Sequence, residues 1–139
     1  MKMRPKVFTL EEANQLLPEI ETRLNGLIEK KENYTRLHDE LLMHDLIAHA
    51  ENKDGLFPVA IGLEEEVRHL ETAIVRLEED IRSIQELGCV LRNLEQGWVD
   101  FLGEWKGEQI YFCWKRGETS IQFYHPLKAD MTERRPLHQ

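Results

Sequence analysis

An uninterrupted apolar repeat between residues 63 and 84 constrains the fold more than any other feature of the sequence. Its members follow one another at alternating steps of four and three residues, which is the heptad spacing of a helix that packs lengthwise against another helix. Gly88 follows the repeat and can supply the left-handed residue that ends a helix. We therefore predict a helix over residues 63–87. The repeat consists of Leu63, Val67, Leu70, Ile74, Leu77, Ile81 and Ile84.

A second apolar stripe predicts a longer first helix over residues 9–50. Thr9 and Glu12 have the spacing of a capping box, in which each side chain accepts a hydrogen bond from the other residue's amide. Pro18 lies inside the stripe, and because proline lacks an amide hydrogen and clashes with the preceding turn, we expect a kink or short break near residues 15–17. The stripe consists of Leu10, Ala13, Leu17, Ile20, Leu24, Leu27, Tyr34, Leu37, Leu41 and Ala48.

Residues 51–62 separate the two stripes and are rich in turn formers, which predicts the loop of a long antiparallel helical hairpin with a coiled-coil seam. Lys31, His38 and Asp45 fall where an unbroken first stripe would need apolar residues. Two alternatives follow from these polar positions. Either the distal end of the hairpin is loosely packed and gains a partner, or it is a solvated extension that gains none.

The composition changes after Gly88 to aromatic and β-branched residues separated by glycines, which is typical of strands and turns. The predicted fold is therefore α+β, with the helical hairpin followed by a three-stranded antiparallel β-meander over residues 98–125. Residues 126–139 have no clear period and are expected to lie across a surface as a tail. At 139 residues the chain has the size of one domain, so we expect a single domain over residues 1–139. The strands are expected at residues 98–104, 109–115 and 120–125, with turns at Lys106–Gly107 and Arg116–Gly117–Glu118.

The register of the meander is predicted from the condition that residues paired across the three strands have their side chains on the same face of the sheet. Leu102 is then paired with Tyr111, and Phe112 with Phe123. This register places Cys113 and His125, the plausible thiol and base of a nucleophilic enzyme, on opposite faces of the sheet. The apolar face, expected to pack on the helices, holds Val99, Phe101, Ile110, Phe112, Trp114, Ile121 and Phe123. The mixed face holds Trp98, Asp100, Leu102, Tyr111, Cys113, Lys115, Gln122 and Tyr124.

Short motifs along nearly the whole chain carry a family resemblance. They are Phe8-Thr9-Leu10-Glu11-Glu12-Ala13-Asn14, Leu16-Leu17-Pro18, Gly97-Trp98-Val99-Asp100-Phe101, Tyr111-Phe112-Cys113-Trp114, Gly117-Glu118, Tyr124-His125 and Arg135-Pro136-Leu137. From about Phe8 to Leu137 the chain resembles the bacterial family of uncharacterised proteins designated domain of unknown function 2203. The resemblance implies an architecture and recurring residues but no reaction, because the family has no established activity. Residues 129–133 depart from the glycine-containing stretch that the family usually has before its Arg-x-Pro motif.

Charge and composition exclude several classes of protein. The net charge of −8 argues against binding to nucleic acid or to an anionic membrane, because both need a basic surface. No apolar run approaches the ~18 residues of a membrane span, and the basic start is followed by Glu11 and Glu12 rather than by the apolar region of a signal peptide. We therefore expect a cytoplasmic protein. Cys89 and Cys113 have neither metal-type nor redox spacing and are interpreted as half-buried apolar residues.

The first candidate site is a polar cluster at the corner between the meander and the tail. Carboxylates, an imidazole and a guanidinium beside an indole could bind a small anion or a polar ligand. The alternative is structural, with a Glu118–Arg135 ion pair fixing the tail, His125 capping a strand end and Trp114 in the core. The candidate ligand-binding residues are Asp100, Trp114, Glu118, His125 and Arg135.

The second candidate is a metal site at one end of the hairpin, because its residues have the spacing of helical carboxylate sites. Against it, Val67 and Leu70 on the seam turn His69 away from the other helix, and a di-metal site would need the Glu-x-x-His step on two helices. We therefore expect no metal and no cofactor. The residues concerned are His44, Asp45, His49, Glu66 and His69.

The third candidate is an interaction surface on the mixed face of the sheet, formed by Trp98, Leu102, Tyr111 and Tyr124. Coverage of this face by the chain's own tail is the alternative. The sequence favours a non-enzymatic interaction or scaffold domain that forms a homodimer or binds a protein partner. The runner-up is a small-ligand or metal-binding domain, or a minor enzyme, with its site at the corner described above.

Overall fold

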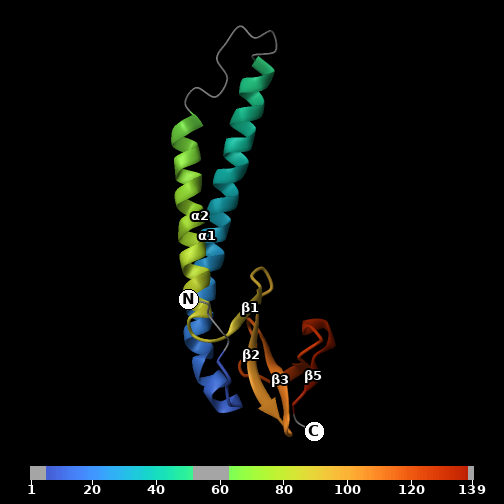
Figure 1. Cartoon of the computed structure of the whole chain (residues 1–139). Helices are drawn as coiled ribbons and strands as arrows, with labels where there is room; N and C mark the ends of the chain where they lie inside the picture. The colour runs from blue at the N-terminus through green and yellow to red at the C-terminus, as the bar shows by residue number, and fades with distance from the viewer. Residues whose placement is uncertain (1–5, 52–62, 138–139) are drawn as a thin grey trace. The chain divides into compact units, whose positions relative to one another are not determined.

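The computed structural model describes residues 6–51 and 63–137 and shows an α+β fold, in which two helices precede an antiparallel sheet (Figure 1). The expected loop lies outside the described residues except for Glu51, which is the last residue of the first helix. The elements are α1 (Leu10–Glu51), α2 (Leu63–Gln85), β1 (Val90–Asn93), β2 (Trp98–Trp105), β3 (Glu108–Lys115), β4 (Phe123–Pro126), a 3-10 helix (Met131–Glu133) and β5 (Arg135–Pro136).

The chain divides into two compact units. The first unit consists of Met1–Ile28 and Asp80–Gln139 and contains the sheet, and the second unit is Glu29–Glu79 and consists of the distal parts of α1 and α2. That the two units make up a single domain stays a prediction. Neither described helix has an apolar stretch long enough to cross a membrane.

The ends of the helices follow the sequence prediction. The Glu12 amide donates to the Thr9 hydroxyl over 3.1 Å and the Thr9 amide donates to the Glu12 carboxylate over 2.9 Å, so the capping box is confirmed. Gly88, with a φ of 99°, follows the end of α2 as predicted. The expected short break near residues 15–17 is wrong, because α1 runs unbroken through Pro18. Burial of Leu17 and Ile20 on either side of the proline offsets the lost hydrogen bond.

The sheet has five strands rather than three, in the order β1-β2-β3-β4-β5, and every neighbouring pair is antiparallel. The predicted meander corresponds to β2, β3 and β4. The prediction missed β1, and it missed β5 in the tail, which pairs with β4. Both strands are too short, at four and two residues, for a period-two pattern to reveal them.

The register is as predicted between β2 and β3 but differs by one residue between β3 and β4. Leu102 pairs with Tyr111, which confirms the first prediction. Phe112 pairs with Tyr124 and not with Phe123. A one-residue shift turns every side chain of a strand to the other face, so Phe123 and His125 lie on the mixed face and Tyr124 lies on the apolar face.

The cause of this shift is the connection between β3 and β4, which is longer than the expected turn. The Glu118 carboxylate accepts from the Lys115 amide over 2.7 Å, and the Glu118 carbonyl accepts from the Trp114 indole over 2.8 Å. The Asn14 side chain on α1 accepts from the Ile121 amide over 2.8 Å. These bonds hold residues 116–122 outside the sheet, so β4 begins only at Phe123.

The core of the first unit combines the apolar face of the sheet with the first part of α1. Phe8 packs edge-to-face on Phe101 with ring centroids 5.3 Å apart, and its amide donates to the Leu102 carbonyl. Gly103 lies where a side chain would overlap the Phe112 ring and approach the Phe8 carbonyl, so close packing and not a turn requires this glycine. Other buried members are Ala13, Leu17, Ile20, Leu24, Leu27, Ile84, Val99, Ile110 and Trp114.

Candidate functional site

The mixed face of the sheet contains a buried carboxylate, Asp100 on β2, which is only 1% exposed. Its Oδ2 lies 2.9 Å from Arg92 Nε and 2.8 Å from His125 Nε2. Its Oδ1 is also buried and has no hydrogen-bond partner. A buried carboxylate oxygen without a partner is costly, which marks this atom as one that could receive a ligand.

His125 on β4 is equally buried, and both of its ring nitrogens face oxygen atoms. Nδ1 lies 2.9 Å from the Pro126 carbonyl, and because a carbonyl can only accept, Nδ1 carries a hydrogen. Nε2, which faces Asp100, is therefore the nitrogen that can share a proton with that carboxylate or bind a ligand through its lone pair. The alternative in which His125 caps a strand end agrees with the Nδ1 contact, because Pro126 is the last residue of β4, but His125 also contacts Asp100.

Arg92 is the third member of this cluster and comes from a β-bulge in β1. The register between β1 and β2 shifts between Leu91 and Asn93, so Arg92 has no residue opposite it. Its guanidinium lies 5.0 Å from the centre of the Tyr111 ring, and that ring in turn lies 5.5 Å from the His125 ring. The Arg92 side chain is 39% exposed, so the cluster has a cation at its solvent side.

Cys113 on β3 is paired directly with Asp100 across the sheet and is fully buried. Burial first, and then the neighbouring Asp100 charge, raise the pKa of the Cys113 thiol to about 12. The prediction that Cys113 and His125 lie on opposite faces is wrong, because of the shifted register of β4. A thiol with this pKa is nevertheless a poor nucleophile at neutral pH.

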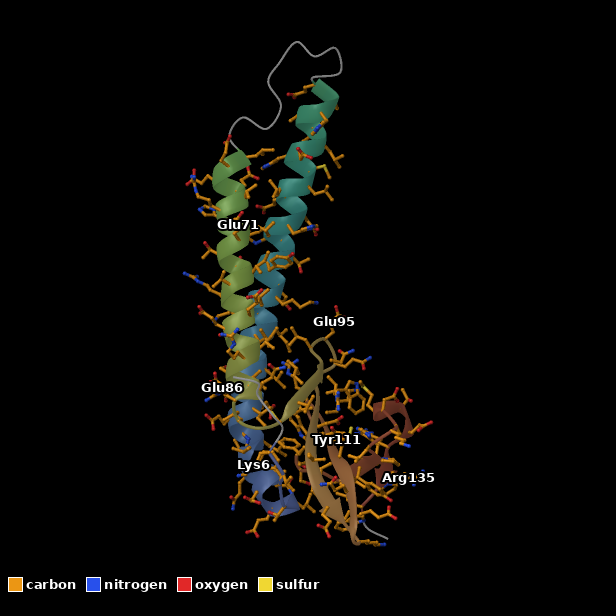
Figure 2. The ribbon with its side chains drawn as sticks, in the orientation of Figure 1. Lys6, Glu71, Glu86, Glu95, Tyr111 and Arg135 are labelled. Atoms are coloured by element: carbon orange, nitrogen blue, oxygen red, sulfur yellow. The ribbon has the colours of Figure 1, made fainter. Side chains whose placement is uncertain are left out.

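A second cluster of side chains, next to the mixed face of the sheet, binds the described part of the tail, residues 126–137. Arg134 Nη1 donates to Glu118 Oε1 over 3.1 Å and forms an ion pair with Glu118 Oε2 at 3.0 Å. Its guanidinium also lies 4.0 Å from the centre of the Phe123 ring and 4.7 Å from that of Trp98. The expected ion pair therefore exists with Arg134 in place of Arg135, which lies exposed on β5 (Figure 2). Consecutive residues of an extended segment point to opposite sides, so only one of the two arginines can reach Glu118.

The five residues of the predicted corner site thus do not form one cluster. Asp100 and His125 are in direct contact, whereas Glu118 belongs to the tail cluster and Trp114 is a fully buried residue of the apolar face. Sequence reasoning missed Arg92 and Arg134 as partners of these acids. Arg134 could have been found as the first residue of the Arg-x-Pro motif, but nothing in the sequence marks the bulge at Arg92.

The predicted interface on the mixed face is covered in part by the chain itself. Trp98 is 8% exposed, with Arg134 on its ring and the Lys115 ammonium 5.5 Å from its centroid. Tyr124 lies on the other face. Leu102 and Tyr111 are half-buried, and Tyr111 packs on His125. The tail therefore covers the part of this face around Trp98.

The helical metal candidates fall into separate pairs. His44 Nδ1 lies 2.8 Å from Glu66, His49 Nδ1 lies 2.8 Å from the Asp45 carbonyl, and His69 lies 3.9 Å from Glu65. Within residues 6–51 and 63–137, the one group of three metal-ligand side chains that the structure brings together is Asp100, Cys113 and His125. Their ligand atoms lie within 4.8 Å of one another.

The second unit exposes an apolar surface that the sequence analysis did not single out. Four large side chains of α1, here called the outer stripe, are between 48% and 56% exposed. They recur at steps of one and three residues, which places them together on one side of a helix. Every described residue of this unit is at least partly exposed. The outer stripe consists of Leu42, Met43, Leu46 and Ile47.

These elements define an α+β protein with a two-helix segment and a five-stranded antiparallel sheet. The chain belongs to the family described as uncharacterized conserved protein (DUF2203), whose model matches residues 6–137. The resemblance carried by the short motifs is thereby confirmed. Comparison with curated proteins and with solved structures found no match.

Proposed function

We propose that this protein is a cytoplasmic, non-enzymatic interaction domain that forms a homodimer through its second unit. In this proposal the two helices of the unit form an antiparallel hairpin, and the outer stripe of α1 is the contact surface. The exposure of Leu42, Met43, Leu46 and Ile47 is the observation that carries it. Contiguous exposed apolar side chains of this size are typical of protein contact sites.

The second unit supports this proposal because α1 is apolar on two opposite sides. Successive residues of a helix are about 100° apart, so Leu37 and Leu41 lie on the side opposite to Met43 and Leu46. Leu37 lines a cavity of about 340 Å³ together with residues of α2, among them Ala73. The outer stripe therefore lies on the side of α1 away from α2. Each apolar side of a helix is typically covered by a packing partner.

A second copy of this chain is the partner that fits the stripe best. The stripe is short, and a two-fold axis between residues 44 and 45 makes it complementary to itself in an antiparallel helix pair. Leu42 then faces Ile47 of the second copy, and Met43 faces Leu46 of the second copy. The same axis sets Glu40 against His49 of the second copy, so the flanking charges do not oppose the pairing.

The gain in free energy allows at most a weak dimer. Burying a Leu, Ile or Met side chain contributes roughly 1.5–3 kcal/mol, and about half of that remains available for each half-exposed residue. Eight such side chains in a dimer contribute roughly 6–12 kcal/mol, whereas association costs about 4–15 kcal/mol. The dissociation constant is thus expected to be no tighter than about 1 μM.

Light scattering coupled to size exclusion tests the proposal with Leu46→Glu. The substitution places two carboxylates in the apolar contact, so the dimer present in the wild type is expected to dissociate while far-ultraviolet circular dichroism stays unchanged. Val75→Glu is the matched control, because Val75 is 52% exposed on α2 and lies outside the stripe. Equal masses for the wild type and Leu46→Glu would contradict the proposal.

Tyr111→Glu separates this proposal from an interface on the mixed face of the sheet. Tyr111 packs on His125 and Arg92 in the first unit and is not part of the outer stripe. The substitution is expected to leave the mass of the dimer unchanged. Dissociation by Tyr111→Glu, with Leu46→Glu still dimeric, would assign the contact to the sheet.

A further inference from the structure

We infer that Asp100, Cys113 and His125 form a binding site for a divalent transition-metal ion of the zinc class. This departs from the expectation, based on sequence, that the protein binds no metal. The three residues come from the adjacent strands β2, β3 and β4 and share one face of the sheet. The inference does not depend on dimerisation, because all three residues belong to the first unit.

The ligand atoms are close enough to share one ion after small movements. Bonds of about 2.0–2.3 Å to a tetrahedral ion place neighbouring ligand atoms roughly 3.3–3.8 Å apart. The atoms of these three residues lie within 4.8 Å of one another, and Asp100 Oδ2 lies 2.8 Å from His125 Nε2. That distance is too short for two ligands of one ion, but Asp100 can bind the ion through Oδ1 instead of Oδ2. Oδ1 is the buried atom that accepts no hydrogen bond.

Hydrogen bonds already orient two of the three residues, His125 and Asp100, in the way that metal ligands are usually oriented. A histidine that binds metal through one nitrogen almost always donates from the other to a carbonyl or carboxylate, and His125 Nδ1 faces the Pro126 carbonyl. A ligating carboxylate is usually hydrogen-bonded through its second oxygen, and Asp100 Oδ2 accepts from Arg92. His125 Nε2 and Asp100 Oδ1 therefore remain as the atoms that can bind an ion beside the Cys113 thiol.

The donor set selects the class of ion. A thiolate, an imidazole and a carboxylate suit Zn²⁺ or Co²⁺, whereas Mg²⁺ and Ca²⁺ prefer oxygen ligands alone. Binding would release the Cys113 thiol proton to the solvent, and the thiolate and Asp100 would together balance the charge of the ion. Three protein ligands leave the fourth position of a tetrahedral ion for water or another small ligand.

Titration of the chelator-treated full-length protein with Co²⁺ tests the inference. One equivalent is expected to bind and to give the charge-transfer absorption of a thiolate–Co²⁺ bond, and Zn²⁺ is expected to displace it. Cys113→Ser should abolish this absorption. Cys89→Ser is the matched control, because Cys89 is also buried but its thiol faces the Ile84 carbonyl. Folded wild-type protein without the absorption, or absorption lost with Cys89→Ser and kept with Cys113→Ser, would overturn the inference.

X-ray absorption of the Zn²⁺-loaded wild type keeps the inference testable if Cys113→Ser does not fold. One sulfur neighbour beside nitrogen and oxygen neighbours is expected. A first shell without sulfur, or one with two sulfurs, would overturn the assignment. Monomeric wild-type protein that still binds one equivalent would count against the proposed dimer alone and would leave the metal site supported.

Discussion

Replacing Asp100 should reveal how strongly the buried cluster stabilises the first unit. Asp100→Ala removes the acceptor of two charge-assisted hydrogen bonds and leaves His125 Nε2 buried without a partner. Removing one member of a buried ion pair costs about 3–5 kcal/mol. The Arg92 contribution must be discounted to about 0–1 kcal/mol, because its side chain is 39% exposed and can turn to water. We therefore expect a loss of roughly 3–4 kcal/mol in the free energy of unfolding.

Asp100→Asn provides the graded comparison. An asparagine oxygen in the place of Oδ2 still faces both Arg92 Nε and His125 Nε2 but carries no negative charge, so the loss should be smaller, at about 1 kcal/mol. Urea unfolding followed by tryptophan fluorescence measures both variants, because the first unit contains all three tryptophans of the chain. A chelator in the buffer removes any contribution of bound metal. An Asp100→Ala variant within about 0.5 kcal/mol of Asp100→Asn would refute this reasoning.

Three further predictions concern packing, titration and thiol chemistry. Gly103→Ala should lower the free energy of unfolding by about 1–3 kcal/mol, whereas Gly26→Ala, in an open position of α1, should raise it by roughly 0.5–1 kcal/mol in the same urea assay. Hydrogen bonds from Thr9 lower the pKa of Glu12 below 4.5, so its stabilisation is present at neutral pH and is lost as pH falls through that lowered pKa, which carboxyl NMR can follow. Cys113, with its pKa raised from 9.0 to about 12, should resist alkylation at pH 8. The free energy of unfolding should fall as pH rises from 9 to about 12, because the thiol ionises at a lower pH in the unfolded chain than in the folded one. Rapid alkylation of Cys113 in folded protein would contradict the last prediction.

Local signals predicted the fold where a few neighbouring residues decide the conformation. The capping box at Thr9 and the glycine after α2 needed no information from distant residues. The β2–β3 register was correct because Lys106 and Gly107 form a two-residue turn with φ values of 52° and 82°, which fixes the pairing of both strands.

The β3–β4 register could not be predicted in this way. Residues 116–122 are held by Glu118 and by Asn14, which lies far away in the sequence on α1. An alternating pattern fits the two neighbouring registers of β4 almost equally well, so the tertiary contact decides between them.

The β3–β4 register also limited what the sequence could predict about the candidate site. Asp100 and His125 were recognised as polar residues of interest, but a shift of one residue separated Cys113 from His125 in the prediction. Arg92 could not be placed, because it lies in a bulge of a strand too short to be seen in the sequence. The outer stripe was missed because one apolar stripe already explained α1, and the second became visible only from the exposure of its side chains.

Sedimentation equilibrium of the wild-type protein from about 1 μM to 1 mM tests most directly whether the outer stripe pairs two chains. The mass is expected to rise with concentration from 16.5 kDa towards twice that value. Added salt should strengthen the association, because each chain carries a net charge of −8 and salt screens the repulsion between them. A mass that stays at 16.5 kDa over the whole range, at low and high salt, would contradict the proposed function.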